Sequence, residues 1–332
     1  MKCTLTEWNQ FIEKHPEAHL LQTGEWGELK SSFGWKSCRL IKDNSGVQVL
    51  FRGLPGGFSL GYIPKGPVGE CWKDLLPEID ALCREQKAIF LKVEPDVWDD
   101  KNCFQDIFES KDWKRSHPIQ PRRTIFIPIS GSEEEILAAM KQKTRYNIHL
   151  AEKKGIEVKI ADDLEAFQQM MKITGNRDGI GVHVQSYYQK AYDLFHPAGK
   201  CDLLFAYYDG KPIAGLMLFV QGKTAWYLYG ASTEVERNRM PTYLLQWEAI
   251  RWAKSKGCSE YDLWGIPDQD EDELEKAFTA KASHDGLWGV YRFKRGFGGN
   301  IRRTIGAWDR IYYPALYGIY SQMMKLRGRQ EE

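Results

Sequence analysis

The chain has 332 residues, of which 42% are hydrophobic and 13% aromatic, and its 46 Lys and Arg almost balance its 45 Asp and Glu. This length favours two domains over a single core. A net charge of +1 argues against extended binding of nucleic acid, because that affinity comes from neutralising many phosphates. Any phosphate-bearing partner must therefore be held locally, at one site.

The first half of the chain predicts three strands, a helix and a fourth strand. Residues 36–54 alternate as two strands about a turn at 44–46, and residues 57–69 form a third strand that ends in a Gly- and Pro-rich loop. An amphipathic helix follows over 74–87, and a buried strand runs over 88–95.

The same order of elements returns in the second half. Residues 203–232 predict three strands joined by turns, 242–257 a helix, and 261–267 a strand. The repeat is too long for a solenoid. It predicts two copies of one α/β domain, each with a mixed sheet and flanking helices.

A basic helical run separates the two copies. It covers residues 130–160 and begins with a capping box at Ser132. Lys141, Lys143 and Arg145 help to make it the most basic helix of the chain. We expect these three cations to contact the backbone of a nucleic acid; a solvated helix face is the alternative.

The common motifs of hydrolases and metal sites are absent. The sequence contains no GxSxG, HExxH or Walker pattern, and its seven cysteines form no CxxC pair. We therefore expect no metal site and no disulfide framework. No apolar run reaches the ~20 residues that span a bilayer, and the N-terminus lacks the apolar run of a signal peptide, so a cytoplasmic location is expected.

A cationic, glycine-rich stretch, "GVYRFKRGFGGN", covers residues 289–300. Its spacing does not match a phosphate-binding loop, so we interpret the glycines as a loop or bulge that redirects a strand. Lys294 and Arg295 would then point to opposite faces, one of them towards a cleft.

The repeated order of strands and helix resembles the GNAT acyltransferase fold. GNAT enzymes bind the pyrophosphate of coenzyme A on a [QR]xxGx[GA] loop at a helix N-terminus. Neither "PKGPVGECWKDLL" nor "STEVERNRMPTYLL" supplies this pattern. We therefore expect an acyl donor other than coenzyme A, and no cofactor.

Seven segments, in family order, resemble the Fem aminoacyltransferases (FemABX). They are "QTGEWGELKSSFGW", "YIPKGPV", "LKVEPD", "MKQKTRYNIHLAEKKGIEV", "WYLYGAS", "YDLWGI" and "YRFKRGFGG". The resemblance implies transfer of Gly, Ala or Ser from aminoacyl-tRNA to the stem-peptide amine of a lipid-linked or UDP-linked peptidoglycan precursor. A monomer is expected, and any contact with a lipid-linked precursor is expected to be peripheral.

The resemblance further implies the organisation of the chain. It is similar to the compact family members that lack a long helical arm. The first GNAT-like domain is then expected over 1–130 with about 307–332, and the second over 131–306.

By position, the resemblance implies which residues bind the substrates. Lys30 matches a lysine that binds the diphosphate of the precursor as a point charge, and His183 stands where an arginine is expected. Histidine is mostly neutral near pH 7 and forms no bidentate fork, so this departure alters the expected phosphate contacts. The other implied residues are Trp35, Lys65, Tyr187, Tyr227, Tyr229 and Arg292, with ordinary aromatic packing as the alternative for Tyr227.

Glu94 and Lys294 match the residues of the family that lie near the reacting groups. Aminolysis of an ester needs an unprotonated amine near the carbonyl and a positive charge near the developing oxyanion. Lys294 suits the second need. We expect Glu94 to orient the amine, because an ordinary carboxylate is a weak base for an ammonium; a pair with Lys65 or Lys92 is the alternative.

Three other functions fit the same residues: an aminoacyl-tRNA protein transferase, an acyl-CoA N-acyltransferase, and a non-catalytic module that binds precursor or tRNA. The first would act on a peptide N-terminus, the second would bind coenzyme A, and the third would yield no product.

Overall fold

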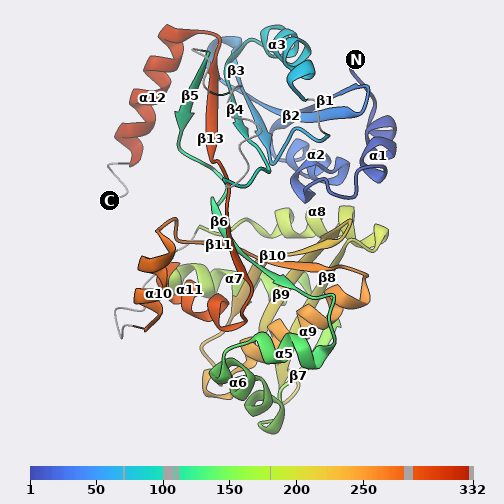
Figure 1. Ribbon diagram of the computed structural model, residues 1–332, viewed down its shortest axis with the longest axis vertical. Helices are drawn as coiled ribbons and strands as arrows, with labels where there is room; N and C mark the ends of the chain where they lie inside the picture. Colours follow the sequence, from blue (N-terminus) through green and yellow to red (C-terminus); the bar gives the residue numbers. More distant parts are fainter. Residues whose placement is uncertain (70–71, 100–107, 109–111, 180, 280–286, 329–332) are drawn as a thin grey trace. The chain divides into compact units, whose positions relative to one another are not determined.

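The computed structural model describes residues 1–69, 72–99, 108, 112–179, 181–279 and 287–328. The chain forms two compact units (Figure 1): unit 1 holds Met1–Gln120 and Thr304–Glu332, and unit 2 holds Pro121–Arg303. The first boundary lies before the expected residue 130, because the strand over Arg123–Pro128 pairs within the sheet of unit 2.

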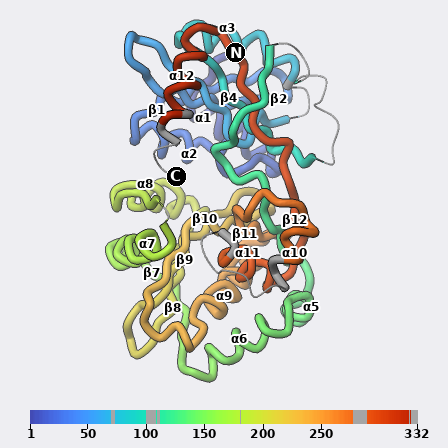
Figure 2. The backbone as a smooth tube through the Cα atoms, turned by 90° about the vertical axis from the view of Figure 1, so that its left-hand side faces the viewer, coloured from blue at the N-terminus to red at the C-terminus, as the bar shows by residue number. Residues whose placement is uncertain are grey.

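Unit 1 contains a six-stranded sheet in the order β1-β2-β3-β4-β13-β5. β3 and β4 are parallel, and the other neighbours are antiparallel. The last strand, β13, lies between β4 and β5, and Figure 2 shows this C-terminal segment, in red, beside the earlier elements of unit 1. The strands are β1 Trp35–Lys42, β2 Ser45–Gly53, β3 Ser59–Pro64, β4 Ala88–Glu94, β5 Trp113–Ser116 and β13 Ala307–Ile311.

The two faces of this sheet are covered differently. α3 packs on the apolar face, where Ile79 and Leu82 join the cluster that contains Val49 and Leu91. α2 and α12 pack on the other face, near its two ends (Figure 1). The helices of unit 1 are α1 Leu5–Glu13, α2 Gly24–Ser31, α3 Leu76–Glu85 and α12 Pro314–Gly328.

Unit 2 contains a seven-stranded sheet in the order β12-β6-β11-β10-β9-β8-β7. β10 and β11 are parallel, and the remaining neighbours are antiparallel. The strands are β6 Arg123–Pro128, β7 Glu157–Ala161, β8 Cys201–Tyr208, β9 Lys211–Gln221, β10 Thr224–Ser232, β11 Glu260–Ile266 and β12 Asn300–Arg303.

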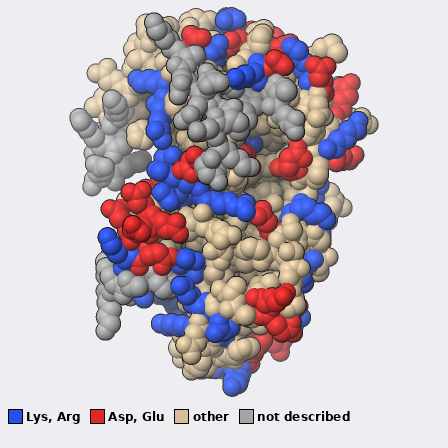
Figure 3. Space-filling model, in the orientation of Figure 1, with Lys and Arg blue, Asp and Glu red and all other residues tan. Residues whose placement is uncertain are grey.

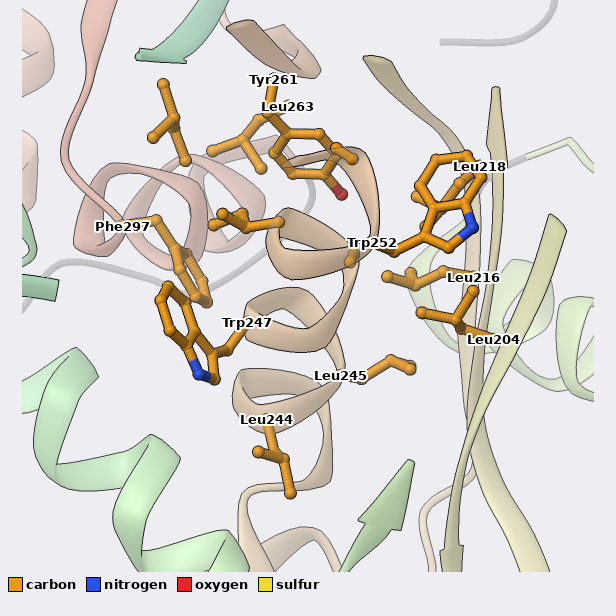
Figure 4. Close-up of a cluster of buried hydrophobic side chains, with 14 of the residues drawn as sticks. Leu204, Leu216, Leu218, Leu244, Leu245, Trp247, Trp252, Tyr261, Leu263 and Phe297 are labelled. Carbon is orange, nitrogen blue, oxygen red and sulfur yellow. The ribbon is translucent and has the colours of Figure 1, made fainter. Parts of the chain in front are cut away.

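Helices cover both faces of the second sheet. Figure 4 shows α9 between Phe297 on one side and Leu204, Leu216 and Leu218 of the sheet on the other. α7 packs on the opposite face, where a Cβ at Gly215 would meet Phe167. The helices are α5 Glu133–Ala139, α6 Gln142–Lys153, α7 Leu164–Asp178, α8 Gln185–Phe195, α9 Pro241–Ser255, α10 Glu271–Thr279 and α11 Leu287–Gly296.

The predicted order of three strands, a helix and a strand is confirmed in both units. The predicted basic run is helical but divides into α5 and α6 at Met140, whose backbone is extended. The strand predicted around Lys294 is wrong, because these residues form α11. Gly298 and Gly299 follow this helix with φ of +82° and +80°, a region that only glycine enters readily.

Candidate functional site

The parallel strands β10 and β11 separate partway along their length. Their pairing is limited to Thr224–Trp226 of β10 and Glu260–Asp262 of β11. Beyond that point the register of β10 shifts between Tyr227 and Tyr229, and that of β11 shifts between Asp262 and Gly265. Such bulges bend a strand and increase its twist. We call the place where the two strands part the fork. The corresponding pair in unit 1, β3 and β4, remains paired to its end.

Lys294 reaches the fork from α11. Its Nζ donates a hydrogen bond of 2.8 Å to the main-chain oxygen of Gly265 on β11. The same atom lies 5.5 Å from the ring centre of Tyr227 on β10. Only 6% of Lys294 is exposed. One buried amino group therefore contacts both of the separating strands.

The surroundings of Lys294 favour its neutral form. Burial lowers the pKa of Lys294 to about 7, and the negative charge of Asp262 opposes this shift. The amino group is thus divided between charged and neutral forms near neutral pH, which suits a group that receives or donates a proton.

Asp262 holds the bulge of β11 in place. Its carboxylate accepts hydrogen bonds from the hydroxyl of Thr124 on β6 and, at 2.7 Å, from the main-chain N–H of Trp264. Trp264 has a φ of +62°, which is an outlier for a bulky residue. The bond to its amide stabilises this strained conformation, so Asp262 shapes the fork and also supplies its negative charge.

Tyr227 forms an apolar wall of the fork. Burial raises its pKa to about 12, so its hydroxyl stays protonated. Gln246 of α9 bonds to this hydroxyl and accepts a bond of 2.8 Å from Tyr261. A Cβ at Gly230 would lie 2.2 Å from the same hydroxyl, so glycine there leaves room for the ring.

The other tyrosines implied by the resemblance lie on the opposite face of the sheet. Tyr227 is opposite Leu218 and Tyr229 opposite Met217, and neighbouring residues of a strand point to opposite faces. Tyr229 therefore faces α8, where its hydroxyl is 3.4 Å from that of Tyr187. The ring of His183 stacks on Tyr187 at 3.8 Å. The structure thus groups His183, Tyr187 and Tyr229, and it separates them from Tyr227.

Glu94 is a buried carboxylate in unit 1 whose oxygens are fully engaged. It accepts a hydrogen bond of 2.6 Å from the hydroxyl of Tyr62 and bonds from the main-chain N–H groups of Ile119 and Gln120. Burial raises its pKa in spite of these bonds. The nearest described ion pairs of the two lysines are Lys65 with Asp96 and Lys92 with Asp309, while the charge of Lys92 also acts on Glu94 and partly opposes the rise of its pKa.

Lys30, near the end of α2, and Trp35, at the start of β1, lie close to Arg52 of β2. Arg52 is opposite Trp35 in the β1–β2 ladder, and its guanidinium lies 5.5 Å from the Trp35 ring. The Trp35 ring in turn contacts Tyr62, 6.2 Å away. Burial, and after it the charge of Arg52, lowers the pKa of Lys30. We call Lys30, Trp35 and Arg52 the open face of unit 1; its two cations are near enough to influence each other.

Lys65 and Arg292 are placed differently from the other expected residues. Lys65 is 7% exposed and lies 3.5 Å from Asp96, so its charge is already matched within the fold. Arg292 lies on α11 two positions before Lys294, and residues so spaced on a helix do not face each other. Its charge acts on Tyr243 instead.

The three expected RNA-contacting cations of α6 divide into two kinds. The guanidinium of Arg145 donates to the main-chain oxygens of Ala138 and Met140, at the end of α5. Lys141 and Lys143 are exposed. Figure 3 shows that both signs of charge are spread over the visible face of the protein.

Sequence reasoning missed Asp262, Tyr62 and Arg52. A carboxylate inside the apolar segment "YDLWGI" was the available signal for Asp262, because a charge in a buried strand needs partners. Among the described residues, no cluster of three His, Cys, Asp or Glu could hold a metal ion. In the same part of the chain, no helix has the length and apolar character to cross a bilayer.

Comparison with known proteins agrees with this architecture. A glycyltransferase of Staphylococcus haemolyticus, "Lipid II:glycine glycyltransferase", is 27% identical over 97% of this chain and 95% of its own. The crystal structure of FemX is 24% identical, with a TM-score of 0.83 over 96% of this chain and 98% of FemX. A tandem GNAT protein of clavulanic acid biosynthesis is 11% identical, with a TM-score of 0.52 over 92% of this chain and 94% of its own.

These structures share the fold of two tandem GNAT-like units. The model of the FemAB family matches residues 3–113, 107–211 and 202–325. Because these matches cover nearly the whole sequence, the chain belongs to the FemAB family.

Proposed function

We propose that the protein is an aminoacyltransferase that moves an amino acid from aminoacyl-tRNA to the stem-peptide amine of a peptidoglycan precursor. The observation that carries the proposal is the buried amino group of Lys294 at the fork, within 2.8 Å of a strand oxygen. Its relatives named lipid II:glycine glycyltransferases support the class of reaction and favour a lipid-linked acceptor.

The reaction requires no covalent intermediate with the protein. The acceptor amine attacks the carbonyl carbon of the ester, a C–N bond forms, and the C–O bond to the ribose breaks. The amine loses a proton and the ribose hydroxyl gains one. In its charged form Lys294 would stabilise the oxyanion and supply the proton to the leaving oxygen. A pKa of about 7 allows it to recover that proton near neutral pH.

The open face of unit 1 would hold the diphosphate of the precursor. Lys30 and Arg52 present two cations to it, and a dianion between them would relieve their mutual repulsion. In this chain His183 of unit 2 stands where the resemblance leads us to expect an arginine. Arg52 of unit 1 would supply the second cation for the diphosphate in its place. Glu94 would act by position, because three hydrogen bonds already occupy its oxygens.

The donor would be held mainly at its acceptor end. Lys141 and Lys143 are exposed at the start of α6 and would contact the RNA backbone. Such contacts are few, which agrees with the net charge of +1 and predicts a modest dependence of donor affinity on salt.

The proposal is tested by incubating the protein with glycyl-, alanyl- and seryl-tRNA and either lipid II or UDP-MurNAc-pentapeptide. Mass spectrometry of the stem peptide should show the mass of one added residue, and Lys294→Met should abolish it. Product on a peptide with a free N-terminus would favour the protein-transferase alternative. Transfer from acyl-CoA, or binding without product, would contradict the proposal.

A further inference from the structure

The C-terminal helix α12 carries large apolar residues on two different sides. One side packs on the sheet of unit 1, where Tyr317 and Tyr320 lie 5.2 and 5.1 Å from the ring of Phe90. The other side exposes large apolar residues at helical spacing: Ile319 is 57%, Met323 52% and Leu326 59% exposed. We call these three residues the α12 stripe. Exposed large apolar residues gathered on one side of a helix mark a surface that contacts a partner or a membrane.

The charges around the α12 stripe indicate the kind of partner. The sequence of α12 contains no Asp or Glu, and its only charged residues are the cations Lys325 and Arg327. The neighbouring edge strand β5 adds Lys114, which is exposed and lies 5.6 Å from the ring of Tyr317, so this cation borders the helix directly. An apolar stripe on a helix whose charged residues are all basic, with Lys114 beside it, complements an anionic lipid surface.

The length and flanks of the helix fit an orientation parallel to a bilayer. Its 15 residues span about 22 Å, less than the ~30 Å of a hydrocarbon core. Tyr313, just before the helix, is 36% exposed and contacts Phe58. Tyrosine is enriched at the level of lipid headgroups. These features fit a helix that rests in the headgroup layer.

We propose that α12 docks unit 1 on an anionic membrane, with Ile319, Met323 and Leu326 inserted among the headgroups. This inference rests on the proposed function in one respect, the lipid-linked acceptor. α12 and α2 pack on the same face of the first sheet, so a bilayer at α12 borders the face on which Arg52 and the helix of Lys30 lie. Docking would bring the diphosphate of a membrane-anchored precursor to these cations without a long reach.

The test compares binding of the full chain to vesicles of phosphatidylcholine alone and vesicles containing phosphatidylglycerol. We expect flotation with the anionic vesicles only, and at least a tenfold loss of binding in the triple variant Ile319→Ser, Met323→Ser, Leu326→Ser. The matched control is Ile160→Ser on β7, which is 61% exposed and should bind like the unchanged protein. Lys114→Glu should weaken binding to anionic vesicles.

Several results would overturn the inference. One is equal binding to both kinds of vesicle, and another is full binding by the triple variant. A third is a concentration-dependent dimer that the triple variant abolishes, since the stripe would then be covered by a second copy. Unchanged thermal unfolding of the variant checks that it is folded.

An activity assay separates this inference from the proposed function. The triple variant should lose rate on acceptor embedded in vesicles and keep its rate on soluble UDP-linked or detergent-solubilised acceptor. If the unchanged protein binds anionic vesicles but transfers to no acceptor, the function is wrong and the docking stands. If the variant transfers equally well in vesicles, the docking is wrong and the function stands.

Discussion

The amino group of Lys294 donates a 2.8 Å hydrogen bond to the main-chain oxygen of Gly265, and so connects α11 to the strand that leaves the fork. Gly265 is the first residue of β11 to pair with β6 after the bulge. Lys294 therefore both supports the shape of the fork and places its titrating group there. A substitution of Lys294 should therefore change both stability and activity, and the change in stability should depend on pH.

The first prediction concerns the pH dependence of stability. The pKa of Lys294 is about 7 in the fold against an ordinary 10.5, so between these values the unfolded chain holds the extra proton. Stability of the unchanged protein should therefore rise with pH across this window, by at most about 1.4 kcal/mol per unit. Lys294→Met should remove this rise, and should be the more stable protein at pH 7 but not near pH 10.5.

Thermal unfolding of both proteins from pH 6 to 10.5 checks this prediction. A stability difference that does not change with pH would mean that Lys294 titrates normally. Lys294→Arg, which keeps a charge that does not titrate in this range, should show the low stability at every pH.

The second prediction concerns Asp262 as a positioning residue. Asp262→Asn keeps a side-chain oxygen for the amide of Trp264 but removes the negative charge that opposes the shift of Lys294. The limb of the kcat/KM profile that reports Lys294 should move to lower pH. Thr124→Val, which removes a hydrogen bond to Asp262 and no charge, should lower stability and leave that limb in place. If the pH profile of kcat/KM is the same in Asp262→Asn as in the unchanged protein, Asp262 does not control the pKa of Lys294.

The third prediction separates positioning from proton transfer at Glu94. Glu94→Gln puts an amide against two main-chain N–H donors, which should cost about 1–3 kcal/mol of stability. We expect a moderate loss of kcat/KM with an unchanged pH optimum, and a similar but smaller loss in Tyr62→Phe. A rate loss above about 100-fold with unchanged thermal stability would instead identify Glu94 as a general base.

The fourth prediction concerns the open face of unit 1. Lys30→Met should raise the KM for the acceptor about tenfold, equivalent to ~1.4 kcal/mol, with little change in kcat. Arg52→Met should act in the same direction. Lys36→Met is the matched control, because Lys36 is on the same strand as Trp35 but bonds to Gln86 near the end of α3. If all three variants have the same KM for the acceptor, the open face of unit 1 does not bind the diphosphate.

The fifth prediction distinguishes the cations of α6. Lys143→Ala should weaken binding of aminoacyl-tRNA and reduce its salt dependence by about one charge, with unchanged stability. Arg145→Ala should lower stability, because it leaves the carbonyls at the end of α5 without their donor. Filter binding at several salt concentrations and thermal unfolding measure the two effects. The reverse outcome would assign the RNA contact to Arg145.

The sequence was sufficient to predict the strand order of both units, because turn residues divide the segments clearly. Asp209 and Gly210 take positive φ at the β8–β9 turn, as their composition suggests. The strand predicted in residues 289–300 is wrong because Gly296, Gly298 and Gly299 obscured a helix that carries Phe293 and is followed directly by Phe297. Both contact Tyr243 of α9, a long-range packing that the local sequence does not reveal.

The site was harder to predict than the fold. The resemblance named Lys294 but not what controls it, since Thr124 and Asp262 are 138 residues apart in sequence. The positions of Tyr227 and Tyr229 were equally hard to predict. The register shift between them places their side chains on different faces of the sheet. An ion pair within the fold, such as that between Lys65 and Asp96, also cannot be predicted before the pairing of the strands is known.

The position of β13 has a consequence for synthesis. This strand lies between β4 and the edge strand β5 of the first sheet, and Asp309 within it is 4% exposed. A ribosome makes the chain from the N-terminus, so unit 2 is complete at Arg303, before β13 has left the exit tunnel. Until β13 emerges, the sheet of unit 1 lacks the strand that joins β4 to β5, although unit 2 can already fold. Exposure to chaperones and proteases should accordingly be greatest in the part that is made first.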